Sequence, residues 1–223
     1  MNWSIIIPTY EKENFTKSCL EDLSKLNSSN HEIIIVDNSI TNKTKDLVDN
    51  LNIVNVRYLK SDKNTFSHAC NLGYHNSCGE NVLFLNNDIK VEQYTEWTDL
   101  LLDKVKNDLI IAGPTGGCLD SKTFEFKYET RGIEPINYIS GWCLAASRNT
   151  LEYIKQNNNV FCEDFGFYFE DADLGWTATK MGVKLEIVNI PVRHFGKVST
   201  DKSRVSKLYL NGKNIFLKKW KVK

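Results

Sequence analysis

Acidic side chains occupy two places in the chain where a divalent cation or a proton can be handled. Asp88 ends the tripeptide Asn86-Asn87-Asp88, which follows the apolar segment 82–85. A carboxylate at the end of a strand is well placed to hold a divalent cation that also binds phosphate oxygens. Asn and Asp are also common turn residues, because their side chains bond their own backbone. Taken alone, the tripeptide fits a turn at least as well as a metal site.

A second acidic group, Glu170-Asp171-Ala172-Asp173, places three carboxylates within four residues at the expected start of a helix. Close carboxylates that are partly buried raise one another's pKa, which suits one of them to act as a general base near neutral pH. Acids at a helix N-terminus also favour the helix dipole without any catalytic role. The aromatic residues that precede the group are typical of a walled site or of a core, so both interpretations stay open.

His194 follows the apolar segment 188–192 and precedes Phe195-Gly196. A histidine at the end of a strand can ligate a metal or donate to a phosphate. A hydrogen-bonded histidine near the surface is the simpler alternative.

A group with the composition of a zinc site lies between residues 68 and 78: His68, Cys70, His75 and Cys78. If this segment is a helix, His68 and His75 stand two turns apart, roughly 10 Å along the axis. One tetrahedral zinc ion with bonds of about 2.0–2.3 Å does not span that separation. We therefore predict no zinc site here.

Alternating strands and helices must position these side chains in the first half of the chain. Short apolar runs predict strands at 3–8, 32–36, 53–59, 81–85 and 109–112. Helical spacing of apolar residues predicts helices at 15–26, 44–51, 66–75 and 92–106. This alternation indicates an α/β fold with a mostly parallel, Rossmann-like central sheet flanked by helices on both faces. Ligands bind such sheets beyond the carboxyl ends of the strands.

The pattern changes after Pro114. The segment 124–128 is typical of an edge strand, 138–146 is apolar, and 148–156 has helical spacing. Acids at the start of 171–181 and Gly182 beyond its end predict a helix, with a strand at 183–188 after it. We therefore expect one domain with a small antiparallel section in its second half.

Composition excludes several classes of protein. The 223 residues carry 28 Lys and Arg against 28 Asp and Glu, so no overall field recruits nucleic acid. Six scattered cysteines without a CxxC pair indicate a reducing, cytoplasmic compartment. The N-terminus lacks the features of a signal peptide, and no apolar run approaches the ~20 residues that span a bilayer.

The order and spacing of these segments resemble a family-2 glycosyltransferase of the GT-A fold over nearly the whole chain. The segments that carry the resemblance are Ser4 to Tyr10, Glu32 to Ser39, Asn64 with Asn71-Leu72-Gly73, Val82 to Asp88, Tyr138 to Leu144, Phe169 to Leu174, then Gly182, Pro191 and His194, and Tyr209 to Lys219. Two features depart from the family pattern. Asn86 replaces the first acid of the DxD motif, as in some rhamnosyltransferase-like members. The segment between Asn64 and Asn71 is one residue short and lacks the usual glycine.

The resemblance implies a nucleotide-sugar donor, with UDP favoured and dTDP or GDP open, and a glycan or other hydroxyl-bearing acceptor. The residues implied in donor binding are Pro8, Thr9, Tyr10, Glu11, Asp37, Asn64, Asn71, Asn86, Asn87 and Asp88. Gly141, Trp142 and Glu170 are implied in the sugar and acceptor pocket. The variable segment 118–134 is the candidate for acceptor recognition.

The resemblance also implies the chemistry. Mn²⁺ or Mg²⁺ held by Asp88 and His194 neutralises the charge that builds on the leaving diphosphate. Asp171 takes the proton of the attacking hydroxyl, which gives a single displacement with inversion. The expected organisation is a nucleotide-sugar-binding half at 1–115, an acceptor and catalytic half at 116–200, and a basic helix at 201–223.

One other function stays open, and a third, that of a nucleotidyltransferase, is disfavoured. The altered DxD motif also fits a catalytically inactive sugar- or nucleotide-binding module. A nucleotidyltransferase normally shows a glycine-rich basic loop after its first strand, and residues 10–14 do not provide one.

The segment from Lys197 carries nine basic residues and one acid, with apolar residues at helical spacing. We expect it to pack on its own domain. Peripheral contact with an anionic membrane is the alternative.

Overall fold

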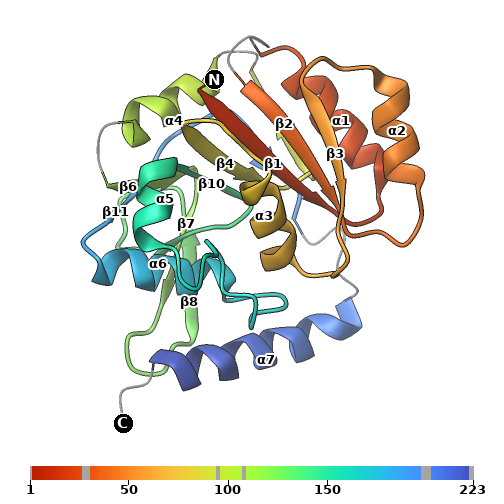
Figure 1. Cartoon of the computed structure of the whole chain (residues 1–223). Helices are drawn as coiled ribbons and strands as arrows, with labels where there is room; N and C mark the ends of the chain where they lie inside the picture. Colours follow the sequence, from red (N-terminus) through yellow and green to blue (C-terminus); the bar gives the residue numbers. More distant parts are fainter. Residues whose placement is uncertain (1, 27–30, 94–95, 107–108, 197–201, 221–223) are drawn as a thin grey trace.

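The computed structural model describes residues 2–26, 31–93, 96–106, 109–196 and 202–220 (Figure 1). The elements of the first half are β1 (Trp3–Thr9), α1 (Glu13–Leu23), β2 (His31–Asp37), α2 (Lys43–Leu51), β3 (Val56–Lys60), α3 (Phe66–His75), β4 (Asn81–Leu85), β5 (Ile89–Val91), α4 (Trp97–Val105) and β6 (Ile110–Gly113). Those of the second half are β7 (Gly116–Leu119), β8 (Phe126–Thr130), β9 (Tyr138–Ile139), β10 (Cys143–Ser147), α5 (Arg148–Ile154), α6 (Glu170–Lys180), β11 (Lys184–Ile187), β12 (Val192–His194) and α7 (Lys202–Trp220).

A seven-stranded sheet runs through the centre in the order β11-β6-β10-β4-β1-β2-β3. Strand β10 is antiparallel to both of its neighbours, and the other pairs are parallel. The expected α/β fold with a mostly parallel central sheet is therefore confirmed. A separate antiparallel sheet in the order β8-β7-β9 forms the small section expected in the second half.

Helices cover both faces of the central sheet (Figure 1). Because side chains alternate along a strand, Ile5 and Ile7 of β1 face one apolar cluster and Ile6 faces the other. Helices α1, α2 and α4 complete the first cluster. Helices α3, α5 and α6 complete the second. Burial of each such side chain stabilises the fold by about 1.5–3 kcal/mol.

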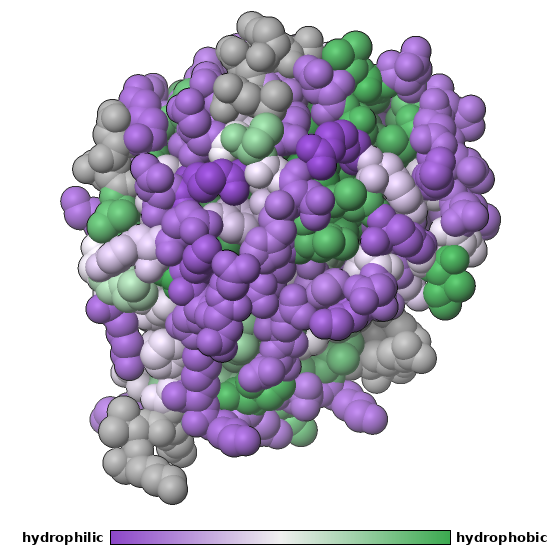
Figure 2. All heavy atoms as spheres, viewed as in Figure 1, coloured by the Kyte–Doolittle hydropathy of each residue, from purple (hydrophilic) through white to green (hydrophobic). Residues whose placement is uncertain are grey.

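Helix α7 lies along the edge of the domain beneath α6 and β8 (Figure 1). Its Phe216 is fully buried in a third cluster with Phe124, Phe165 and Phe169. The apolar side of α7 therefore packs on its own domain, as expected. No helix in the described ranges has the length and apolar character needed to span a bilayer. Hydrophilic side chains cover most of the face seen in Figure 2, and the hydrophobic ones form separate patches.

Several boundaries differ from the sequence prediction for local reasons. The strand predicted at 53–59 begins only at Val56, because Asn52 and Asn55 have φ values of 47° and 66° and form a turn. The helix predicted from residue 92 begins at Trp97, and the short strand β5 before it was missed. The apolar segment 138–146 contains two strands, β9 and β10, with a tight turn between them.

Candidate functional site

Two short strands bring Asp88 and His194 together. Strand β5 pairs antiparallel with β12, and Ile89 lies opposite His194 in the register. The imidazole Nε2 of His194 lies 3.0 Å from Oδ1 of Asp88 and 3.2 Å from the side-chain nitrogen of Asn86. These three side chains therefore form one polar group at the carboxyl end of β4, although His194 lies 108 residues from Asn86 in the chain.

The donor atoms of Asp88 and His194 suit a divalent cation. A carboxylate oxygen and an imidazole nitrogen 3.0 Å apart are close enough to ligate the same ion. Mg²⁺ in such sites takes one or two protein ligands and completes its shell with water and substrate phosphates. No group of three or more His, Cys, Asp or Glu side chains that could hold a metal occurs within the described ranges. Asp88 and His194 would thus supply two protein ligands, a number that fits such a site.

The turn between β9 and β10 places Trp142 on this polar group. The Cys143 N–H donates to the carbonyl of Ser140 at 3.3 Å, and the Asn86 N–H donates to the carbonyl of Trp142 at 2.8 Å. The indole of Trp142 stacks on the ring of His194, with centroids 4.9 Å apart and an angle of 8° between the planes. The stack fixes the orientation of the imidazole.

The same turn also holds Asp171. Its Oδ2 accepts the N–H of Gly141 at 3.0 Å, and its Oδ1 accepts the N–H of Ala172 at 2.8 Å. Burial raises the pKa of Asp171, and the charge of Glu129 raises it further. The carboxylate is therefore oriented by two donors, and its raised pKa suits a general base.

Glu170 is the partner of Asp171 in the acidic pair. Its Oε2 is buried and has no hydrogen-bond partner among the described residues. Burial, and then the charge of Asp171, raise its pKa. A buried acceptor without a partner is uncommon in folded proteins, which makes Glu170 a candidate contact for a ligand.

The carboxylate of Asp37 lies at the carboxyl end of β2 but is enclosed by protein donors. It accepts the Ser39 N–H at 2.9 Å, the Tyr58 hydroxyl at 2.8 Å and the Lys60 ammonium at 3.3 Å. Its exposed fraction is 0%. Direct contact of Asp37 with a nucleotide, which stays a prediction, requires at least one of these donors to move.

The residues at the carboxyl end of β1 and just after it differ in exposure. Pro8 and Thr9 are buried at the end of β1, Tyr10 is half-buried and Glu11 is exposed. The Glu11 N–H donates to the hydroxyl of Ser39 at 2.6 Å. The structure thus brings the ends of β1 and β2 together.

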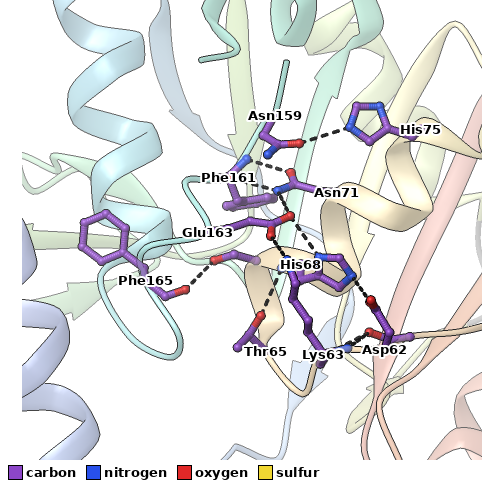
Figure 3. A network of polar contacts seen from close by, with 12 residues as sticks. Asp62, Lys63, Thr65, His68, Asn71, His75, Asn159, Phe161, Glu163 and Phe165 are labelled. Atoms are coloured by element: carbon purple, nitrogen blue, oxygen red, sulfur yellow. Dashed lines mark hydrogen bonds and ion pairs between the residues drawn. The ribbon is translucent and has the colours of Figure 1, made fainter. Parts of the chain in front are cut away.

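Asn71 does not lie at the strand ends (Figure 3). Its side-chain amide donates to the carbonyl of Phe161 at 2.8 Å and accepts the Phe161 N–H at 3.0 Å. Asn64, by contrast, is exposed in the loop before α3. These contacts give Asn71 a structural role, which the sequence analysis missed because Phe161 lies 90 residues away.

Helix α3 places His68 in a network of ion pairs. The Nδ1 of His68 lies 3.0 Å from Glu163, and its Nε2 lies 2.8 Å from Asp62. The side chain of Lys63 pairs with the same Glu163 at 3.0 Å (Figure 3). This ion network was missed, since no local pattern links residues 95 positions apart.

Asn87 is also structural in its contacts. Its side chain is buried and donates to the hydroxyl of Thr16 at 2.9 Å.

Two charged residues of the predicted acceptor segment reach the site. The Arg131 guanidinium donates to the carbonyl of Val192 at 2.6 Å and lies 5.9 Å from the centre of the Trp142 ring. Glu129 accepts the Ser140 hydroxyl at 2.5 Å. Neither residue was singled out from the sequence, although both lie within or beside β8 in the segment 118–134.

A family model described as "Glycosyl transferase family 2" matches residues 4–174. Glycosyltransferase GlyA of Streptococcus pneumoniae is 26% identical over 104 residues, which are 46% of this chain and 15% of that protein. A dolichyl N-acetyl-alpha-D-glucosaminyl phosphate 3-beta-D-2,3-diacetamido-2,3-dideoxy-beta-D-glucuronosyltransferase of Methanococcus voltae is 34% identical over 83 residues, which are 34% of this chain and 26% of that protein. The matches thus span about a quarter or less of these two relatives.

Among solved structures, GalNAc-T7 with UDP, GalNAc and Mn²⁺ is similar over 86% of this chain and 43% of that chain. The TM-score is 0.71 at 15% sequence identity. The likeness shows a shared fold.

Proposed function

This chain belongs to glycosyltransferase family 2, and we propose that it transfers a sugar from a nucleotide diphosphate, UDP in the first place, to an acceptor hydroxyl with inversion. One observation carries the proposal. The dipeptide Gly141-Trp142 contacts both the general-base candidate Asp171 and the metal-ligand candidate His194. Two adjacent residues thereby hold Asp171, the candidate proton acceptor, and His194, the candidate ligand of the metal that would face the diphosphate. A displacement at a sugar carbon requires both groups to be aligned with the substrate.

The donor would occupy the carboxyl ends of β1, β2 and β4. The exposed or half-buried residues that can meet a nucleotide include Tyr10 and Glu11 after β1, and Asn64 in the loop between β3 and α3. The structure of GalNAc-T7 with UDP supports UDP as the first nucleotide to test. We assign residues 1–115 to donor binding and 116–200 to the acceptor and to catalysis.

Asp88 and His194 would hold Mn²⁺ or Mg²⁺, and the ion when bound supplies positive charge against the leaving diphosphate. The stack of Trp142 on His194 keeps the imidazole nitrogen directed at Asp88. Asn86 contributes an amide beside this pair rather than a second carboxylate.

Asp171 would accept the proton of the acceptor hydroxyl. The N–H groups of Gly141 and Ala172 hold its two oxygens, so little reorientation is needed before the proton moves. Glu129 and Arg131 border the same turn and would meet the acceptor, a glycan or another hydroxyl-bearing molecule. The exposed lysines of α7, such as Lys207 and Lys218, would supply positive charge for contact with an anionic membrane.

The proposal is tested by incubating the purified chain with UDP-sugars, Mn²⁺ and a panel of glycan acceptors. We expect release of UDP that depends on an acceptor, and a product whose anomeric coupling constant by NMR shows inversion. Nucleotide binding without release of UDP from any donor would instead support a non-catalytic binding module.

A further inference from the structure

The backbone immediately before the acidic pair is strained. Tyr168 and Phe169 have φ values of 68° and 71°, and both lie in the left-handed region. Bulky side chains rarely adopt this conformation, and it persists only where the surroundings hold it. Phe169 caps α6, so the direction in which Glu170 and Asp171 emerge depends on this turn.

One side of the turn is held by α3. The Ser67 hydroxyl donates to the carbonyl of Phe165 at 3.0 Å, and Asn71 bonds the backbone of Phe161 (Figure 3). These contacts reach as far as Phe165, and the next ones along the chain, at residues 167–169, come from α7.

Helix α7 packs directly on that stretch of backbone. A Cβ atom added at Gly212 would lie 2.5 Å from the carbonyl oxygen of Tyr168 and 3.2 Å from that of Phe167. Glycine is needed here because any larger side chain would separate the helix from the turn. The rings of Tyr209 and Phe216 cover Phe169, with centroid distances of 5.2 Å and 5.5 Å.

The C-terminal end of α7 forms hydrogen bonds with the first turn of α6. Asp173 is buried, and its two oxygens accept the indole N–H of Trp220 at 2.6 Å and the ammonium of Lys219 at 2.7 Å. The Asp173 N–H in turn donates to the carbonyl of Phe169 at 2.8 Å. Asp173 thus connects α7 to Phe169, the second residue of the strained turn.

We infer that Asp173 and Trp220 are positioning residues for the general base. The hydrogen bond between Trp220 and Asp173 and the close packing of Gly212 on the backbone of Tyr168 hold the first turn of α6 in place. In this position Asp171 accepts the N–H of Gly141. This inference rests on the proposed role of Asp171 as the base. By this inference Asp173, the third acid of the acidic group, binds α7 and not the substrate.

The test compares Trp220→Phe and Gly212→Ala with the control Trp176→Phe. Trp220→Phe keeps an aromatic ring but removes the N–H that Asp173 accepts. Trp176 belongs to the same aromatic cluster, with its ring 5.3 Å from Phe216, and no hydrogen bond joins it to Asp173. The measurements are kcat, donor KM, the pH profile of kcat, the melting temperature and hydrogen exchange of the peptide 165–175.

We expect Trp220→Phe and Gly212→Ala to lower kcat about tenfold or more with donor KM within about twofold. The acid limb of the kcat profile should move to lower pH, because a displaced Asp171 is more solvated. Exchange in 165–175 should accelerate. Trp176→Phe should leave the kcat profile and this exchange as in the wild type.

Equal effects of Trp220→Phe and Trp176→Phe on kcat and exchange would overturn the inference, since α7 would then act only through general stability. Adding Asp173→Asn to Trp220→Phe should lower kcat little beyond the single variants, because the two residues share one interaction. Full additivity would also contradict it. A wild-type chain without transfer activity would defeat the proposed function, and hydrogen exchange would still decide whether α7 holds the turn.

Discussion

The backbone N–H of Gly141 donates to Oδ2 of Asp171 at 3.0 Å and so ties the first turn of α6 to the turn ahead of β10. The next residue, Trp142, stacks on His194. Two side chains that handle different parts of the proposed reaction are therefore aligned by one dipeptide. The predictions below follow from this alignment and from the contacts around it.

Gly141→Ala should reduce turnover with little loss of stability. The added methyl group would lie 3.4 Å from the Cβ of Asp171 and 3.5 Å from the ring of Phe66, which is ordinary contact. We expect the free energy of unfolding to change by less than about 1 kcal/mol. We expect kcat to fall because the methyl group would occupy space beside Asp171 that the acceptor hydroxyl needs. Urea unfolding and steady-state kinetics check both parts. A large loss of stability would show that the turn has no room at this position.

Glu170→Gln should stabilise the protein increasingly as pH rises. Burial raises the pKa of Glu170 in the folded state, so the folded protein holds its proton to higher pH than the unfolded chain does. Wild-type stability from this group is therefore lost as pH rises above the unfolded pKa of about 4.3. The neutral Gln variant lacks that loss.

Melting temperatures of wild type and Glu170→Gln between pH 4 and pH 8 provide the measurement. The two curves should lie close together near pH 4, and the variant should melt higher at pH 8. A gap that stays constant with pH would mean that Glu170 ionises normally in the folded protein.

Asp88→Ala should abolish the part of nucleotide binding that depends on metal. UDP with Mn²⁺ should raise the melting temperature of the wild type, by an amount set by RT ln(1 + [L]/Kd). The variant should lose the increment due to Mn²⁺ because one of its two candidate ligands is gone. Asp99→Ala, on helix α4, is a matched control that should keep the full shift. An undiminished Mn²⁺ increment in Asp88→Ala would place the metal elsewhere.

Asn71→Ala and Asn64→Ala should separate structural from ligand-binding roles. Loss of the Asn71 amide leaves the N–H and carbonyl of Phe161 without their partner, which should lower stability by about 1–3 kcal/mol. Asn64 is exposed, so its removal should leave stability unchanged and weaken nucleotide binding. Denaturant unfolding and calorimetric titration with UDP test the pair. Weaker UDP binding in Asn71→Ala with unchanged stability, and normal binding in Asn64→Ala, would show instead that Asn71 contacts the nucleotide.

The central sheet was predictable from the sequence because its strands are short apolar runs that end in polar residues. The bounds of α3 and β4 match their predicted ranges. Gly182 ends α6 as expected, with a φ of +79° that favours glycine. These features are local, so neighbouring residues carry the information.

The contacts that shape the candidate site were less accessible to sequence analysis. Strands β5 and β12 have three residues each, too few to show an alternating pattern. The stack of Trp142 on His194 and the clamp of Trp220 on Asp173 join residues distant in the chain. Polarity alone could not separate Asn71 from Asn64, since the partner of Asn71 is the backbone of a remote loop.

The most direct test of the account is the turnover of Asp171→Asn with its donor binding measured in parallel. The matched control is Asp164→Asn, an exposed aspartate in the segment that leads to α6. We expect Asp171→Asn to lower kcat by about 10²–10⁴-fold with nearly unchanged affinity for UDP, because general-base catalysis contributes that much. Asp164→Asn should behave as wild type. Near-wild-type transfer by Asp171→Asn would remove Asp171 as the base and contradict the central claim.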